Sequence, residues 1–247
     1  MTSKQVMLAW AVLLIGGCSL LGPPKGADPL IGPYEHRQVW AVAPLRNESG
    51  SQYADGAALA DAIARHLEGA SNLDVLPVNR TLQAMDALKM GPPSNPAEAM
   101  RLLKMLGADG LVIGTVSAYD PYDPPKLGIA LELYVRPSRH RPLVGLDVRK
   151  LSRAARLPSP PSWGSPNWSR QPVASVSAFL DAADPVVRGK LERYALGRGS
   201  AKAPDSSVLY RISMDLYSEF ATYVMSWRLL RAETQRVAKA TENQPVP

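Results

Sequence analysis

Hydrophobic positions in the first half of the chain alternate between short continuous runs and helical spacing, which predicts strands and helices in turn. The runs VWAVAP and LVIGTV are short and flanked by turn residues, as buried strands are. Between the runs, apolar residues recur every three to four positions, as on one face of a helix. In chain order the pattern predicts a strand at 38–44, a helix from about Tyr53 to Gly69, a strand at 73–78, a short helix at 80–89 capped by Asn79, a helix opened by Asn95-Pro96-Ala97-Glu98 and ended by Gly107, and a strand at 110–117.

Beyond residue 118 the pattern changes to strict alternation of apolar and polar positions. Residues 127–135 and 143–151 both alternate, and a short basic connection at 136–141 joins them, so we predict an antiparallel hairpin. With the preceding elements, this predicts the α/β class: a helix-covered mixed sheet in the order β-α-β-α-α-β, then the hairpin and a long C-terminal helix. We expect one shared core that includes Val42, Ile63, Leu67, Val112 and Ile113.

The C-terminal third is predicted to be helical. A helix begins at Asp184-Pro185 and ends near Gly197, and one long helix covers about 207–239. At 1.5 Å per residue the long helix exceeds the ~30 Å diameter of a small domain. We therefore expect its half at 224–237 to project beyond the core and contact a partner through Trp227, with Met225, Leu229 and Leu230 partly exposed. Its predicted apolar stripe is Leu209, Ile212, Leu216, Phe220, Tyr223, Trp227 and Leu230, widened by Tyr217, Ala221 and Val224.

The N-terminus has the pattern of a bacterial lipoprotein signal. Lys4 precedes an apolar run at 6–15, which is too short to span a bilayer as a helix. The run leads through Gly16-Gly17 into Cys18, the only cysteine of the chain. This junction resembles a lipobox, which implies cleavage of residues 1–17 and acylation of Cys18, and the following Ser19 implies the outer membrane, periplasmic face. We expect a stable lipid anchor, followed by a flexible proline-rich tether at 18–37.

Composition is consistent with a folded domain and long loops. The 247 residues are 46% hydrophobic and carry a net charge of +6, and many of the 23 prolines gather at 23–33, 121–125 and 158–172. We predict the following division: signal peptide 1–17, tether 18–37, α/β domain 38–151, proline-rich loop and short helices 152–206, long helix 207–239, and a disordered tail 240–247.

Two motifs in the predicted α/β domain resemble those of TolB-like N-terminal domains. The segment 42–50 (VAPLRNESG) is followed by Ala54-Asp55-Gly56, and the segment 106–110 (LGADG) leads into the strand at 111–116. The same unit occurs in lipoproteins of the CsgG, LpoB and FlgO type. The resemblance covers about residues 38–118 and implies an adaptor or assembly component. From the residues alone, the polar side chains of these motifs have structural roles in a turn and at a helix N-terminus.

No sequence motif indicates catalysis, a cofactor or a metal. The chain has no P-loop, dinucleotide-binding, GxSxG or HExxH pattern. His36, His66 and His140 lie in different segments, and we interpret them as solvated surface residues. The chain is therefore predicted not to be an enzyme.

The loop Asp120-Pro-Tyr122-Asp123-Pro-Pro is the most unusual one in the sequence. Its two carboxylates can bind a cation, or its prolines can present a rigid recognition surface to a partner. The interpretation that we favour is a stiff connection between two strands, with the aspartates capping turns.

Basic residues are dense at 136–156. They can contact lipid phosphates or an acidic partner, or they can be the solvated edge of a hairpin, and the sequence does not separate these alternatives. Nucleic acid is not an expected partner, because the predicted compartment is the envelope. The residues are Arg136, Arg139, Arg141, Arg149, Lys150, Arg153 and Arg156.

The sequence as a whole favours a non-enzymatic outer-membrane lipoprotein that serves as an assembly or accessory factor of an envelope machine. Its partners would be the membrane, through the lipid, and an envelope protein. One alternative is a subunit of a homo-oligomeric secretion pore of the CsgG type. Another is a periplasmic activator of a cell-wall synthase, as LpoB-type proteins are, and the least favoured is an unrecognised hydrolase.

The lipid anchor gives a first testable prediction. Cys18→Ser removes the thiol that would carry the lipid, so the variant should stay uncleaved or become soluble, without an acylated N-terminus. Intact mass spectrometry of the membrane fraction measures this. A wild-type chain that begins elsewhere and carries no lipid would contradict the prediction.

Overall fold

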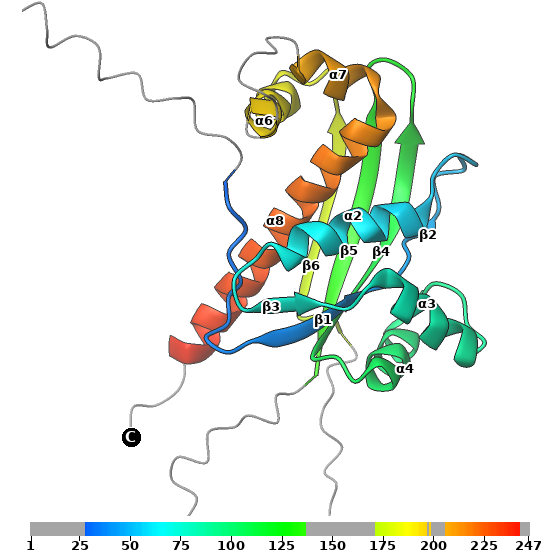
Figure 1. Ribbon diagram of the computed structural model, residues 1–247, viewed down its shortest axis with the longest axis vertical. Helices are drawn as coiled ribbons and strands as arrows, with labels where there is room; N and C mark the ends of the chain where they lie inside the picture. The colour runs from blue at the N-terminus through cyan, green and yellow to red at the C-terminus, as the bar shows by residue number, and fades with distance from the viewer. Residues whose placement is uncertain (1–27, 137–170, 197, 199–205, 243–247) are drawn as a thin grey trace, which may run out of the picture.

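A computed structural model of the chain describes residues 28–136, 171–196, 198 and 206–242 (Figure 1). A mixed sheet is covered by helices on both faces, which confirms the predicted α/β class. The elements are β1 (Gln38–Val42), β2 (Arg46–Asn47), α2 (Gly56–Glu68), β3 (Leu73–Val75), α3 (Val78–Ala87), α4 (Pro96–Leu106), β4 (Gly110–Asp120), β5 (Lys126–Val135), β6 (Ala174–Asp181), α6 (Pro185–Leu196), α7 (Ser206–Ile212) and α8 (Met214–Glu242).

The sheet has the strand order β3-β1-β4-β5-β6. β1 pairs in parallel with both β3 and β4, and the short β2 also pairs in parallel with β4. β5 pairs antiparallel with both of its neighbours, β4 and β6. The parallel part comes from the β-α-β-α-α-β half of the sequence, because parallel neighbours need crossover helices, whereas β4 and β5 are joined by a short turn.

Each face of the sheet has its own hydrophobic core, because successive side chains of a strand point to opposite faces. Val42, Ile63, Leu67 and Val112 pack together under α2 and α8, as predicted. Ile113 was predicted to share that core, which is wrong. It lies on the opposite face, among the residues of α3 and α4.

Two predicted helix starts and their motifs are confirmed. The carboxylate of Asp55 caps α2 by accepting from the backbone N–H groups of Ala57 and Ala58. The next position requires glycine, because a Cβ at Gly56 would lie 1.9 Å from the carbonyl oxygen of Leu45. Asn95 caps α4, and Gly107 ends it with a φ of 69°. At α3, however, Pro77 occupies the cap position instead of the predicted Asn79.

The neighbours of β5 differ from the prediction. Along Lys126–Leu133 it lies between β4 and β6. The predicted partner strand at 143–151 lies outside the described residues. β6 falls in the region 152–206, where only a loop and short helices were predicted. Its inward positions alternate with Ser175, Ser177 and Phe179, and the apolar Phe179 on the outward side weakens the pattern that would predict a strand. The inward residues are Ala174, Val176, Ala178 and Leu180.

The predicted long C-terminal helix is present as α8, but the first turns of the predicted span form a separate short helix, α7. α7 ends at Ile212 and α8 begins at Met214, and the hydroxyl of Ser213 between them accepts from the N–H of Leu216 (3.4 Å). Because of this break, Leu209 and Ile212 do not continue the stripe of α8 and are 55% and 56% exposed. The buried face of α8 contains Tyr217, Ala221 and Val224, which were predicted to widen the stripe, together with Phe220 and Leu230 of the stripe itself. Tyr223 and Trp227 of the predicted stripe are half-buried.

The second half of α8 does not project from the core, contrary to the prediction. Met225, Leu229 and Leu230 are 0%, 0% and 2% exposed, and Glu233 is fully buried. The helix is accommodated because it runs diagonally across the sheet, over β5 and β6 and beside α2 (Figure 1). Only residues from about 238 onward are continuously exposed.

The second half of the predicted tether packs on the domain. The hydroxyl of Tyr223 donates to the carbonyl oxygen of Asp28 (2.6 Å), and the hydroxyl of Tyr34 donates to the carboxylate of Glu233 (2.6 Å). The segment from Asp28 to Tyr34 therefore runs alongside α8 before the chain enters β1 (Figure 1). Within the described ranges, no helix combines the length and hydropathy that a membrane span requires.

The second core can be tested with one substitution. Ile113→Asp places an unpaired carboxylate among Leu103, Leu111 and Tyr134, and it should lower the free energy of unfolding by several kcal/mol. Ser117→Asp is the matched control, because Ser117 lies on the same strand and is exposed. It should change stability by about 0.5 kcal/mol or less. Equal denaturation midpoints for the two variants would place Ile113 at the surface.

Candidate functional site

A groove lies between α2 and the N-terminal half of α8, at the end of the sheet where β4 turns into β5. It consists of two adjoining hollows of about 480 and 410 Å³ that share Tyr53, Tyr119 and Asp215. Tyr122 and Pro121 complete one hollow, and the side of α2 and the first turns of α8 form the other. We call this surface the tyrosine groove.

The three tyrosines come from a loop, a strand and a turn. Tyr53 follows the turn 47–51, in which Asn47 accepts from Ser49 and donates to the carbonyl oxygen of Ser51 (2.8 Å), while Gly50 has a φ of 74°. Tyr119 stands near the end of β4. Tyr122 lies in the β4–β5 turn and is 77% exposed, with its N–H bonded to Asp120 (3.2 Å). The peptide bond between Asp123 and Pro124 is cis.

Carboxylates give the tyrosine groove a negative character. Asp55, Asp61 and Asp215 line it. Among the described residues that line it, the single cation is Arg65, which is paired with Glu219. Burial, and then the charges of Asp215 and Asp55, raise the pKa of Tyr119. The groove is thus an aromatic surface with unneutralised negative charge.

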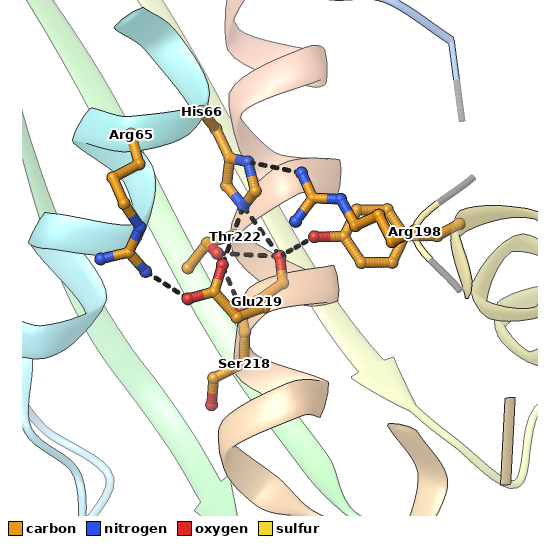
Figure 2. Close-up of polar contacts among 7 residues, drawn as sticks. Arg65, His66, Arg198, Ser218, Glu219 and Thr222 are labelled. Atoms are coloured by element: carbon orange, nitrogen blue, oxygen red, sulfur yellow. Dashed lines mark hydrogen bonds and ion pairs between the residues drawn. The ribbon is translucent and has the colours of Figure 1, made fainter. Parts of the chain in front are cut away.

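Beside the groove, a cluster of polar contacts centred on His66 and Glu219 connects α2 to α8 (Figure 2). The Nε2 atom of His66 lies 3.0 Å from the carbonyl oxygen of Glu219, and its Nδ1 atom lies 3.5 Å from the guanidinium of Arg198. The same carbonyl oxygen accepts from the hydroxyls of Tyr194 (3.2 Å) and Thr222 (3.1 Å). One backbone oxygen thus joins side chains from α2, α6 and α8.

His66 was predicted to be a solvated surface residue, which is wrong. It is 6% exposed and is in edge-to-face contact with Tyr194 and Tyr223. Burial lowers its pKa, and the cations Arg198 and Arg65 lower it further, while the backbone bond to Glu219 and that residue's carboxylate act in the opposite direction. The ring is therefore held neutral and serves as a structural bond between two helices.

A separate pocket of about 280 Å³ lies on the opposite flank of α8 from the tyrosine groove, between α8 and α6. Trp227, Tyr223 and Val224 form its apolar wall, and Asp28 lies at its edge. Its other lining residues are Lys190, Arg193, Tyr194, Phe220 and Arg228. We call it the α6–α8 pocket.

A buried carboxylate holds the N-terminal segment to α8. Glu233 is fully buried and accepts from the Nε (2.7 Å) and Nη2 (2.6 Å) of Arg236 as well as from Tyr34. Burial and the carboxylate of Glu233 raise the pKa of Tyr34, which therefore stays a hydrogen-bond donor. The bidentate bond to Arg236 compensates for the cost of burying the charge.

The sequence-predicted site residues are not brought together. Tyr122 lines the tyrosine groove, whereas Trp227 lines the α6–α8 pocket. Asp120 ends β4 and Asp123 lies in the β4–β5 turn, and neither lines the groove. Arg136 is turned inward, where it donates to the carbonyl oxygen of Leu103 at the end of α4 (3.2 Å). His36 is exposed. Cys18, His140, Arg139, Arg141, Arg149, Lys150, Arg153 and Arg156 lie outside the described residues.

Sequence reasoning missed Tyr53 and Asp215 as groove residues. The sequence analysis named the turn at 47–50 and the Ala54-Asp55-Gly56 motif, and the one exposed aromatic residue between them was the signal that could have identified Tyr53. For the part of the chain that the structure describes, no group of three or more His, Cys, Asp or Glu residues is placed to hold a metal ion. The arrangement offers surfaces for binding.

The sequence matches no protein-family model and no curated protein. Among solved structures, the chain is similar to lipoprotein GNA1162 from Neisseria meningitidis, with 15% identity and a TM-score of 0.39 over 65% of this chain and 96% of that one. It is also similar to the LpoB C-terminal domain from Salmonella enterica, with 14% identity and a TM-score of 0.33 over 44% and 76%.

A variant of the PelC dodecamer from Paraburkholderia phytofirmans gives 13% identity and a TM-score of 0.31 over 79% of this chain and 95% of that one. The structural neighbours thus include bacterial lipoproteins. A TM-score below 0.5 does not establish a common fold, so these likenesses carry no functional conclusion.

The neutral state of His66 predicts a pH dependence of stability. Because its folded-state pKa lies below the unfolded value, the unfolded chain binds more protons as the pH falls below about 6.5, and stability is lost. The loss is at most about 1.4 kcal/mol per pH unit for a single proton. His66→Gln can keep the bond to Glu219 without titrating, so its denaturation midpoint should fall less between pH 7 and pH 5. The exposed His36→Gln should behave as wild type, and equal slopes for all three chains would refute the assignment.

Proposed function

We propose that this protein is a lipid-anchored, non-enzymatic accessory factor of the bacterial envelope, which binds a protein partner through the tyrosine groove. The observation that supports this most is the convergence of Tyr53 from the loop before α2, Tyr119 from β4 and Tyr122 from the β4–β5 turn on one hollowed surface. The anchor is inferred from the lipobox-like residues around Cys18.

The chemistry of the groove favours a protein partner. Tyrosine supplies a large apolar area with a polar tip at low entropic cost, and it is enriched at protein interfaces. Several polar groups of the groove already have internal partners, since Asp55 caps α2 and Arg65 pairs with Glu219. The remaining negative charge of Asp61 and Asp215 is complementary to a partner surface rich in lysine or arginine.

The length of the free tether favours a site of action close to the membrane. Because Asp28 is bonded to α8, nine residues lie between it and Cys18, and a fully extended chain over those ten steps reaches at most about 35 Å. The sequence had suggested a tether of about twice that length. This short reach favours a membrane-proximal accessory factor over an activator that must extend to a cell-wall synthase.

The environment of β5 favours the accessory role over the alternative of a secretion-pore subunit. A pore strand would direct its apolar face toward lipid. In β5 that face consists of Leu127, Ile129, Leu131 and Leu133, and these side chains are at most 1% exposed in the core under α2 and α8. Exposing them would require α8 to leave the sheet.

Site-specific photocrosslinking in cells tests the proposed function. A benzophenone amino acid placed at position 53 or 122 should give one discrete adduct with an envelope protein, and the adduct should be found in the membrane fraction. Val186 on α6 is the matched control, because it is 65% exposed and lies away from the groove. The control position should give no adduct of that mass.

Two outcomes would contradict the proposal. Equal adducts at the control position would show that the groove has no special role. Adducts at multiples of the 26.7 kDa chain mass would show self-association at the groove, as the pore alternative requires.

A further inference from the structure

The α6–α8 pocket carries positive charge that the tyrosine groove lacks. Three basic side chains line it, Lys190 and Arg193 from α6 and Arg228 from α8, against one acidic residue, Asp28. Arg228 donates to the carbonyl oxygen of Ser177 (3.1 Å), and Arg193 donates to that of Gly189 (3.4 Å). Among the described residues, none of the three cations forms an ion pair with a carboxylate.

The same pocket has an aromatic wall. Trp227 and Tyr223 are half-buried, and Phe220 lies behind them. Just outside the pocket, the guanidinium of Arg231 lies 5.1 Å from the ring centre of Trp227. A ligand that fits this combination has a negatively charged group for the cations and an apolar or glycerol part for the aromatic wall.

The pocket lies where the chain leaves the domain toward Cys18. Asp28, which is held by Tyr223, is both a lining residue of the pocket and the beginning of the described chain. In Figure 1, the first described residues lie beside α8, not far from α6. On the inferred tether, the pocket lies within about 35 Å of the acylated residue, so that it can reach the surface of the bilayer.

We infer that the α6–α8 pocket binds the headgroup of an anionic phospholipid, with the phosphate between Lys190, Arg193 and Arg228 and the glycerol region against Trp227. This inference rests on the proposed function, because the lipid anchor supplies the proximity. Binding orients the domain, with the α6-facing flank of α8 on the membrane surface. Each lysine or arginine near an anionic membrane strengthens membrane binding about fivefold. A half-buried tryptophan such as Trp227 is suited to the membrane–water interface.

A vesicle sedimentation assay tests the pocket without the anchor. The protein is the chain from residue 18 onward with Cys18→Ser, so that neither an acyl chain nor the apolar run at 6–15 contributes. The probes are phosphatidylethanolamine vesicles with and without phosphatidylglycerol. We expect binding only with phosphatidylglycerol, and we expect that added salt weakens it.

Two triple variants, each of which removes three positive charges, distinguish the effect of the pocket from the effect of net charge. Lys190→Gln, Arg193→Gln and Arg228→Gln together should weaken binding on the order of a hundredfold. Arg80→Gln, Arg101→Gln and Lys104→Gln together are the matched control, because these exposed residues lie on α3 and α4. The control should bind as the parent chain does. Thermal melting of both variants verifies that each is folded.

Trp227→Ala tests the apolar part of the site. It should weaken binding to phosphatidylglycerol vesicles, while glycerol 3-phosphate in solution should compete with the vesicles for the parent chain. The inference would be overturned if the parent chain did not bind phosphatidylglycerol vesicles. It would also be overturned if the pocket variant and the α3–α4 control lost vesicle binding equally. Equally tight binding to polyglutamate would overturn it as well, because that result would indicate an acidic protein in place of a lipid.

Failure of this inference is distinguishable from failure of the proposed function. The vesicle assay contains no acyl anchor and no protein partner. A negative result would therefore leave the crosslinks at positions 53 and 122, and the mass of the acylated N-terminus, unchanged. Conversely, a wild-type chain without lipid at Cys18 would end the proposed anchoring whatever the vesicles show.

Discussion

The structure depends on the placement of one helix, α8, whose 29 residues span about 44 Å. A helix of this length with a continuous apolar stripe must be covered along most of it, and the sheet together with α2 provides the cover. Two polar contacts fix its position: the Glu219 carbonyl oxygen on His66, and the buried Glu233 between Arg236 and Tyr34. Because a buried polar group without a partner is costly, both contacts penalise any sliding of α8 along the sheet.

The position of α8 also sets where the two candidate surfaces lie. The tyrosine groove is on the α2 flank of the helix and the α6–α8 pocket is on the other, with the His66 cluster between them. They differ in charge, since carboxylates line the groove and three unpaired cations line the pocket within the described chain. A surface that suits a basic protein partner and one that suits an anionic membrane are therefore held apart by a rigid element.

The sequence predicted the elements whose signals are local. The β-α-β-α-α-β order, the caps Asp55 and Asn95 and the terminating Gly107 all follow from spacing within a few residues. The errors arose where tertiary contacts decide. Ser213 interrupts a helical pattern that continues through it, and His66 is buried because α8 and α6 cover it. β6 needs β5 as a neighbour, since its own alternation is weak. For the site, the unusual loop gave Tyr122, but the sequence could not show that Tyr53 and Asp215 would lie beside it.

The tether shows how a few side chains change a conclusion drawn from composition. Prolines and glycines at 22–33 indicate a linker, and composition alone sets its reach at about twenty residues. Two hydrogen bonds reduce this length to about half. The hydroxyl of Tyr34 in the N-terminal segment binds α8, and the hydroxyl of Tyr223 on α8 binds the N-terminal segment, and composition reveals neither contact. The reach of a chain scales with its length, so on the proposed lipid anchor this halving favours a domain held near its membrane over one that reaches far from it. On the same proposal, attachment beside a basic, aromatic pocket would restrict orientation as well as distance, and the tyrosine groove on the other flank of α8 would stay accessible to a protein partner.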